Sequence, residues 1–126
     1  MPTATINGVR LFYARTGETG PPLVLVHGSW GDHHNWDLVA PTLAAHCRVL
    51  VYDRRGHSRS ERPPGRSSAD QHGDDLATLV EQLGLAPAHF AGSSFGSYIL
   101  LRLASRRPDL FRGLAVHEPP LLGNLT

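Results

Sequence analysis

The sequence predicts an α/β fold with a mostly parallel sheet and an antiparallel hairpin at the N-terminus. From residue 23 onward, short apolar runs that suit buried strands alternate with stretches of helical periodicity. The connections between these runs are too long for hairpins, so right-handed crossovers should join parallel strands. Near the N-terminus, Asn7-Gly8 suits a two-residue hairpin turn and adds an antiparallel edge.

Alternating and continuous apolar runs predict the strands. Residues 5–6 and 9–15 flank the hairpin turn, and Val9, Leu11 and Tyr13 fall on one face, which should be the more buried. Continuous apolar runs are typical of strands that are covered on both faces of a parallel sheet. Such runs occupy residues 23–26, 48–52, 88–91 and 113–117.

Three segments have helical character. The first spans residues 35–46, and Pro41 either interrupts it or lies in its early turns. The second is capped by Ser67 or Ser68 and ends at Gly84. Its apolar side chains at helical spacing are Leu76, Leu79, Val80 and Leu83. The third helical segment follows the apolar run that starts at residue 88. This helical segment ends near residue 107, just before a proline.

The segment at residues 88–101 organises the chain, because it contains G-x-S-x-G between a predicted strand and a predicted helix. A tight strand-to-helix turn leaves no room for side chains two residues before and after its centre, and Gly92 and Gly96 meet that demand. Such a turn exposes Ser94 as a nucleophile and places the Phe95 N–H at a helix start. The alternative is a glycine-rich loop with an idle serine; the strand and helix on either side favour the catalytic interpretation.

Composition restricts the function further. The 126 residues suffice for one domain, and a net charge of +1 gives no reason to expect nucleic acid or an acidic membrane surface as a partner. No apolar run reaches membrane-spanning length, and the N-terminus lacks the features of a signal peptide, so a cytoplasmic location is expected. Cys47 is the single cysteine and excludes an internal disulfide.

Four motifs together resemble the N-terminal half of the α/β-hydrolase fold. They are His27-Gly28 after a buried strand, the loop D-R-R-G-H-S-R-S at residues 53–60, G-x-S-x-G at residues 92–96, and H-E-P-P at residues 117–120. The sequence is most similar to the serine esterase, perhydrolase and cofactor-free haloperoxidase-like group. Haloalkane dehalogenases and epoxide hydrolases place aspartate at the elbow, and Ser94 argues against both.

The resemblance implies roles for individual residues. Ser94 would attack an acyl carbon, and the Phe95 N–H would form half of an oxyanion hole. The N–H of Ser29 is the first choice for the other half, with Trp30 the second. Trp30 and Phe95 are candidate substrate-binding residues, as is Trp36, although each could equally belong to the core. No cofactor and no metal ion are expected.

The histidines are expected to be mostly structural or solvated. His27 would shape the loop after its strand rather than act as a base. Asp53 and His57 could form an acid–base pair, but the resemblance implies that their loop is structural, with its Asp and Arg side chains holding the turn. A solvated loop or helix surface is expected for five further histidines, which are His33, His34, His46, His72 and His89. Metal binding by His33-His34 with Asp32 is conceivable, but adjacent residues converge poorly on one ion.

Members of this family carry their catalytic serine, acid and histidine in that order along the chain. We expect the chain to end after about strand six, so that residues 1–126 are the N-terminal part of the domain and lack the lid and the C-terminal catalytic segment. No residue matches the catalytic histidine. Glu118 lies where some relatives carry their acid; a structural or lid-anchoring glutamate is the alternative. A homo-oligomer or a complementing C-terminal chain would then be a candidate partner.

These observations predict a serine hydrolase that acts on a small ester-like carbonyl substrate through an acyl-enzyme, incomplete in this chain. Two alternatives remain open. One is a catalytically silent remnant that serves as a binding or assembly module. The other is perhydrolase or haloperoxidase-like chemistry on the same serine, which peroxide-dependent halogenation would reveal.

Overall fold

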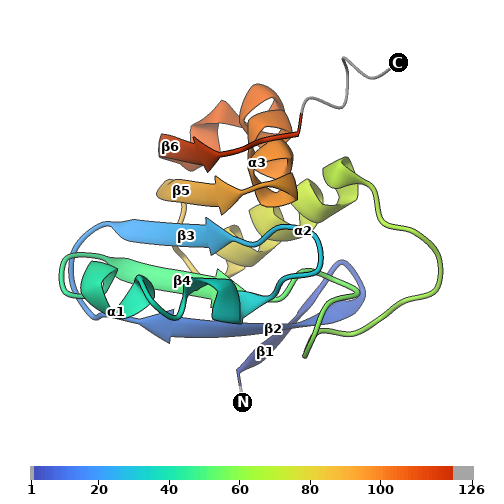
Figure 1. Ribbon diagram of the computed structural model, residues 1–126, viewed down its shortest axis with the longest axis horizontal. Helices are drawn as coiled ribbons and strands as arrows, with labels where there is room; N and C mark the ends of the chain where they lie inside the picture. Colours follow the sequence, from blue (N-terminus) through green and yellow to red (C-terminus); the bar gives the residue numbers. More distant parts are fainter. Residues whose placement is uncertain (1, 121–126) are drawn as a thin grey trace.

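A computed structural model describes residues 2–120 as a six-stranded mixed sheet with helices on both faces (Figure 1). The strand order is β1-β2-β4-β3-β5-β6. The strands are β1 (Thr3–Ile6), β2 (Val9–Thr16), β3 (Pro22–Val26), β4 (Arg48–Tyr52), β5 (Ala88–Ser93) and β6 (Phe111–His117). β2 is antiparallel to both β1 and β4, whereas β4, β3, β5 and β6 are mutually parallel. The predicted fold class is confirmed.

The N-terminal hairpin closes through the predicted dipeptide. Asn7 and Gly8 both have positive φ, 50° and 80°, as a type I′ turn requires, and Ile6 pairs with Val9. The sequence predicts that the face of β2 with Leu11 is more buried than the opposite face. Phe12 lies on the opposite face, yet it is also buried. Phe12 is covered because the ring of His33 lies against it, with the ring centroids 4.7 Å apart.

Two longer helices pack together on one face of the sheet (Figure 1). α2 (Ala69–Gln82) begins where the Ser68 hydroxyl accepts a 3.0 Å hydrogen bond from the Gln71 N–H, so that Ser68 rather than Ser67 is the cap of the two that the sequence predicts. α3 (Phe95–Arg106) follows β5 directly. The apolar core beneath them combines helix residues such as Leu76 and Leu103 with the inward-facing side chains of the central strands. This packing holds both helix N-termini at the carboxyl end of the parallel strands.

The opposite face carries only short helical segments, so the predicted helix at residues 35–46 is wrong in its continuity. The structure has a 3-10 turn η1 (His33–Trp36) and one turn of α-helix α1 (Ala40–Leu43). Pro41 lies at the start of α1, where its missing N–H costs no intrahelical hydrogen bond. Another 3-10 turn, η2 (Pro108–Leu110), leads into β6, which starts two residues earlier than predicted.

β6 forms one edge of the sheet in the described part of the chain. Its side chains are mostly exposed, and Leu114 and Val116 are 38% and 41% accessible. Among residues 2–120, none of the helices combines the length and apolarity needed to cross a membrane.

Candidate functional site

The turn between β5 and α3 holds Ser94 in a strained, exposed conformation. Ser94 has φ 53° and ψ −121°, a combination that a non-glycine residue rarely adopts. A Cβ at Gly92 would lie 2.9 Å from the backbone of Gly96, and a Cβ at Gly96 would lie 2.7 Å from the His27 carbonyl oxygen. Both positions therefore require glycine, and the side chain between them projects from the carboxyl end of the sheet.

Backbone hydrogen bonds hold this turn in place. The Ser94 N–H donates to the His117 carbonyl of β6 at 2.8 Å. The Ser94 carbonyl accepts from the Ser97 N–H at 2.9 Å, and this hydrogen bond forms part of the first turn of α3. The Ser97 hydroxyl donates to the Gly92 carbonyl at 2.8 Å. The Ser94 hydroxyl itself has no hydrogen-bond partner within residues 2–120.

The loop that follows β3 lies against the turn. A Cβ at Gly28 would be 3.1 Å from the Ser94 Cβ and 3.6 Å from the Phe95 nitrogen. Ser29 and Trp30 come next; both are exposed, and Trp30 is completely so, with φ 64°. In the described part of the chain, the N–H groups of Ser29, Trp30 and Phe95 have no hydrogen-bond acceptor. Three unpaired backbone donors thus lie near one exposed hydroxyl.

His27 is a structural residue at the end of β3. Its ring is fully buried, its Nδ1–H donates to the Gly28 carbonyl at 2.8 Å, and its Nε2 accepts from the Arg54 N–H at 3.0 Å. Burial, with a further contribution from the Arg54 charge, lowers the pKa of His27 to about 4. Both ring nitrogens are occupied, so this histidine shapes the loop beside Ser94, as expected from the sequence.

Arg54 is a buried cation that joins this loop to the loop after β4. Its side chain is 2% exposed and donates to the carbonyls of His27 and Gly28, at 3.2 and 3.0 Å. Its Nη1 donates to the Nε2 of His72 at 3.0 Å, and its guanidinium lies 5.3 Å from the centre of the Phe95 ring. Burial lowers the pKa of Arg54 to about 10. Within residues 2–120 no carboxylate forms an ion pair with it.

The prediction that His72 is solvated is wrong. His72 lies on α2, is 4% exposed, and accepts from Arg54 through Nε2, while its Nδ1 has no partner in the part of the chain that the structure describes. Burial and the Arg54 charge lower its pKa to about 3. The sequence contained a signal for this burial, because position 72 lies four and seven residues before Leu76 and Leu79, on the apolar stripe of the helix.

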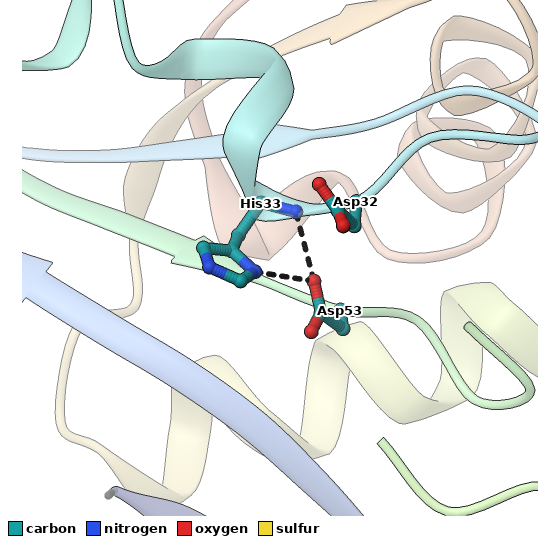
Figure 2. A group of neighbouring side chains, drawn as sticks. All are labelled: Asp32, His33 and Asp53. Atoms are coloured by element: carbon teal, nitrogen blue, oxygen red, sulfur yellow. Dashed lines mark hydrogen bonds and ion pairs between the residues drawn. The ribbon is translucent and has the colours of Figure 1, made fainter. Parts of the chain in front are cut away.

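The prediction that His33 is solvated is also wrong. His33 is 7% exposed, and both its N–H and its Nδ1 contact Asp53 Oδ1, at 2.8 and 2.7 Å (Figure 2). The other oxygen of Asp53 accepts from the Arg59 N–H at 3.0 Å. Asp53 is thus the buried acceptor that holds two loops together, which confirms the expected structural role of its side chain.

Asp32, His33 and Asp53 form a candidate metal-binding group. Ligand atoms of Asp32, His33 and Asp53 lie within 4.8 Å of one another (Figure 2). However, the hydrogen bond to Asp53 requires a proton on His33 Nδ1, and three N–H contacts already occupy the Asp53 carboxylate. Asp32 accepts from the His34 N–H at 2.8 Å and caps η1. These contacts suit a hydrogen-bonded structural cluster better than a ligand set.

Asp53 and His57 do not form an acid–base pair. Asp53 binds His33, whereas the Nδ1–H of His57 donates to the Arg55 carbonyl at 3.0 Å. The Nε2 of His57 lies 3.5 Å from Arg54 Nη2. Of the other histidines, His34 and His46 are exposed, as expected, and His89 is partly buried.

Glu118 follows β6 directly after the residue that binds Ser94. It has φ 48°, its side chain is 81% exposed, and its Oε1 lies 3.9 Å from His117 Nε2. Its place next to the turn is consistent with the position expected of an acid. No other residue of the described chain holds its carboxylate in a fixed direction.

Two clefts flank the turn. One, of about 580 Å³, is lined on one side by Ser29, Trp30 and Phe95, and on the other by the loop after β4 and by His72. The second, of about 240 Å³, lies where β5 and β6 end and is lined by Trp36. Trp30 and Phe95 therefore share a cleft, and Trp36 belongs to a different one.

Comparisons with known proteins agree with this architecture. A family model described as alpha/beta hydrolase fold matches residues 21–125. The "Dihydrolipoyllysine-residue acetyltransferase component of acetoin cleaving system" of Pseudomonas putida is 39% identical over 107 residues, which are 85% of this chain and 29% of that protein. The "Uncharacterized hydrolase YraK" of Bacillus subtilis (strain 168) is 38% identical over 122 residues, 95% of this chain and 45% of that protein.

A solved structure extends the comparison to three dimensions. The enol-lactonase from Burkholderia xenovorans LB400 superposes with a TM-score of 0.86 at 35% sequence identity, over 90% of this chain and 45% of that one. The chain therefore spans less than half the length of each of these three proteins.

Proposed function

The chain belongs to the α/β hydrolase fold family, and on this premise we propose that it carries the nucleophile of a serine hydrolase acting on small ester-like carbonyl substrates. Ser94 attacks the acyl carbon, the ester C–O bond breaks, and the leaving oxygen takes up the proton released by the serine hydroxyl, which gives an acyl-enzyme and an alcohol. Water then hydrolyses the acyl-enzyme to the carboxylic acid and restores the Ser94 hydroxyl. One observation carries the proposal: Ser94 is an exposed side chain at positive φ between two glycines that have no room for a Cβ. Strain of this kind gathers at functional sites.

The oxyanion hole is proposed to consist of the N–H groups of Phe95 and Ser29, with Trp30 as the second choice for the latter. All three are unpaired in the described chain, and Gly28 brings their loop against Ser94. In systems where one such donor has been removed, the loss is roughly 3 kcal/mol of transition-state stabilisation. Trp30 and Phe95 also line the larger cleft, which is the proposed acyl site.

The general base is proposed to lie outside residues 2–120. Within them, the Ser94 hydroxyl has no hydrogen-bond partner, and His27, His33 and His72 hold structural hydrogen bonds. Glu118 is the candidate acid in this range, because the residue before it binds the Ser94 N–H. Its exposed side chain would need a histidine from elsewhere in the protein to orient it.

The names of the relatives support acyl chemistry without identifying a substrate. A lactonase opens a cyclic ester, and an acetyltransferase component carries an acetyl group; both reactions move an acyl group. The similarity to these proteins supports a proposal within that chemical range. The proposal is therefore limited to esters, lactones and similar carbonyl compounds of small molecules.

A fluorophosphonate probe tests the proposal, because it modifies serine hydroxyls that are aimed and activated for acyl transfer. The purified full-length protein should be labelled at one site, which peptide mass spectrometry should assign to Ser94. Ser94→Ala should abolish labelling. Ser93→Ala, at the neighbouring partly buried serine, is the matched control and should retain it. A folded protein that is left unlabelled, or labelled elsewhere, would contradict the assignment.

A binding or assembly module without catalysis is the second candidate. It is favoured by the exposed edge strand β6, where Leu114 and Val116 lie open in the described chain. Light scattering after size-exclusion chromatography would show a stable oligomer, together with an unlabelled Ser94. A labelled monomer would contradict it.

A further inference from the structure

The larger cleft beside Ser94 has an unbalanced charge. Its lining in the described chain includes Arg54 at the base and Arg66 in the loop that precedes α2, and it includes no Asp or Glu. Arg66 is exposed and has no ion-pair partner among residues 2–120. Two cations therefore face this space, and no carboxylate lining it neutralises them.

The buried cation is the stronger of the two observations. Within residues 2–120 all acceptors of Arg54 are neutral: two backbone carbonyls, His72 Nε2 at 3.0 Å and His57 Nε2 at 3.5 Å. Guanidinium has five N–H donors and does not lose its charge at neutral pH. A buried charge without a counter-ion is unfavourable, and its field extends further in a site of low dielectric than at the surface. An anion in the cleft would supply the missing counter-charge.

The neutral groups around Arg54 do not replace that counter-ion. Burial and the Arg54 charge both lower the pKa of His72 and of His57, so both rings are neutral near pH 7. Asp75, the buried carboxylate of α2, is committed to Arg55 through two hydrogen bonds of 2.6 and 2.9 Å. Asp53 is occupied by His33 and by the Arg59 N–H.

We propose that this cleft binds a carboxylate-bearing substrate, an ester or lactone whose acid group lies several atoms from the carbonyl attacked by Ser94. Arg66 contacts the carboxylate at the rim, and Arg54 attracts it from below the Phe95 ring. The uncharged part of the acyl chain packs on Trp30 and Phe95, which line the same space. The inference rests on the proposed function for the identity of the carbonyl, but the carboxylate site is a claim about binding alone.

Binding is measured with Ser94→Ala protein, so that no turnover occurs. The probes are monomethyl adipate, which is anionic at pH 7.5, and its neutral counterpart dimethyl adipate, titrated into ¹⁵N-labelled protein and followed by amide shifts. The anionic probe should bind about fivefold more tightly at low salt, as expected for a few partly screened charge contacts. The preference should largely disappear in 0.5 M salt, because the Debye length is then only about 4 Å.

Arg66→Gln in the same background should reduce the preference about threefold. Arg112→Gln is the matched control, since Arg112 is exposed near the opposite end of the parallel strands and does not line the cleft. Equal affinity for the two esters, no binding of either, or an unchanged preference in Arg66→Gln would overturn the carboxylate site. If the preference holds but Ser94 of the unmutated protein resists fluorophosphonate, the proposed catalysis fails and the binding site stands.

Discussion

The N–H of Ser94 donates a 2.8 Å hydrogen bond to the carbonyl of His117. This bond joins the strained turn to β6, the outermost strand of the described sheet. The Ser97 hydroxyl reinforces the junction, because it also accepts from the His117 N–H at 3.0 Å. The conformation of the proposed nucleophile therefore depends on a residue of β6 that lies 23 positions further along the chain.

The first prediction concerns the close approach of α3 to β3. Gly96→Ala should destabilise the protein by about 3 kcal/mol, because its Cβ would collide with the carbonyls of Val26 and His27, which are held in the sheet and its adjoining loop. Urea unfolding followed by circular dichroism measures the loss. Gly73→Ala in α2 is the control: its Cβ would meet chiefly the flexible end of Arg106, and alanine favours the helix. If both variants unfold at similar urea concentrations, the tight packing at residue 96 is incorrect.

The second prediction concerns the strain at the turn. Ser94→Gly should raise the stability by about 1 kcal/mol, because glycine adopts φ 53° without the steric cost that serine incurs. For a protein of this size, that corresponds to about 4 °C in the melting temperature. Ser94→Ala, which keeps a Cβ in the same conformation, should leave the melting temperature nearly unchanged. A Gly variant that melts no higher than the Ala variant would argue against strain at this position.

Adjacent aspartates of α2 provide the third prediction. Asp75 forms a buried bidentate ion pair with Arg55, and its Oδ1 also accepts from the Asn7 side chain at 3.0 Å. Asp75→Asn should cost about 3 kcal/mol, since it leaves the Arg55 charge buried and unpaired. Asp74→Asn removes an exposed pair with Arg106 and should cost less than about 1 kcal/mol. Comparable losses in chemical denaturation would show that burial does not distinguish the two pairs.

The fourth prediction is a loss of stability in mild acid. Burial lowers the pKa of His27 from 6.5 to about 4, so below pH 6.5 the unfolded chain binds a proton that the folded chain refuses. Stability should therefore fall as the pH decreases from about 6.5 to about 4, by roughly 3 kcal/mol from His27 alone. His72, whose pKa is lowered to about 3, should extend the decline below pH 4.

Thermal melts at intervals between pH 7.5 and 4 check this dependence. His27→Gln, in which the amide has no proton to gain over this range, should start less stable but lose less stability between pH 6.5 and 4. His34→Gln, at an exposed histidine, is the control and should follow the unmutated protein. A slope that is identical in all three proteins would exclude His27 as its source.

Local rules were sufficient for much of the fold. Asn7-Gly8 closes the hairpin because those residues tolerate positive φ, and Ser68 starts α2 because its hydroxyl can accept from a free N–H. The spacing of Gly92 and Gly96 around Ser94 likewise follows from the sterics of a strand-to-helix turn. The hairpin turn and the helix cap involve only neighbours along the chain, whereas the demand for glycine at residue 96 also comes from the carbonyls of Val26 and His27.

Contacts between distant segments decided the rest. His33 and His72 are buried because Asp53 and Arg54, about twenty residues away in the chain, supply their hydrogen bonds. The helix predicted at residues 35–46 divides because Asp53 engages the N–H at the start of η1 and Pro41 starts a separate turn.

The sequence by itself determined the succession of strands and longer helices along the chain, the turn at Ser94 and the family to which its motifs point. Only the tertiary structure decided that Arg54 is buried with no carboxylate partner among residues 2–120, that Asp53 pairs with His33 rather than His57, and that Trp30 and Phe95 line the same cleft next to the turn. The physical reason is the distance along the chain over which each kind of interaction acts. Backbone preferences act over a few residues, whereas the environment of a charge is set by whichever segments the folded sheet brings around it.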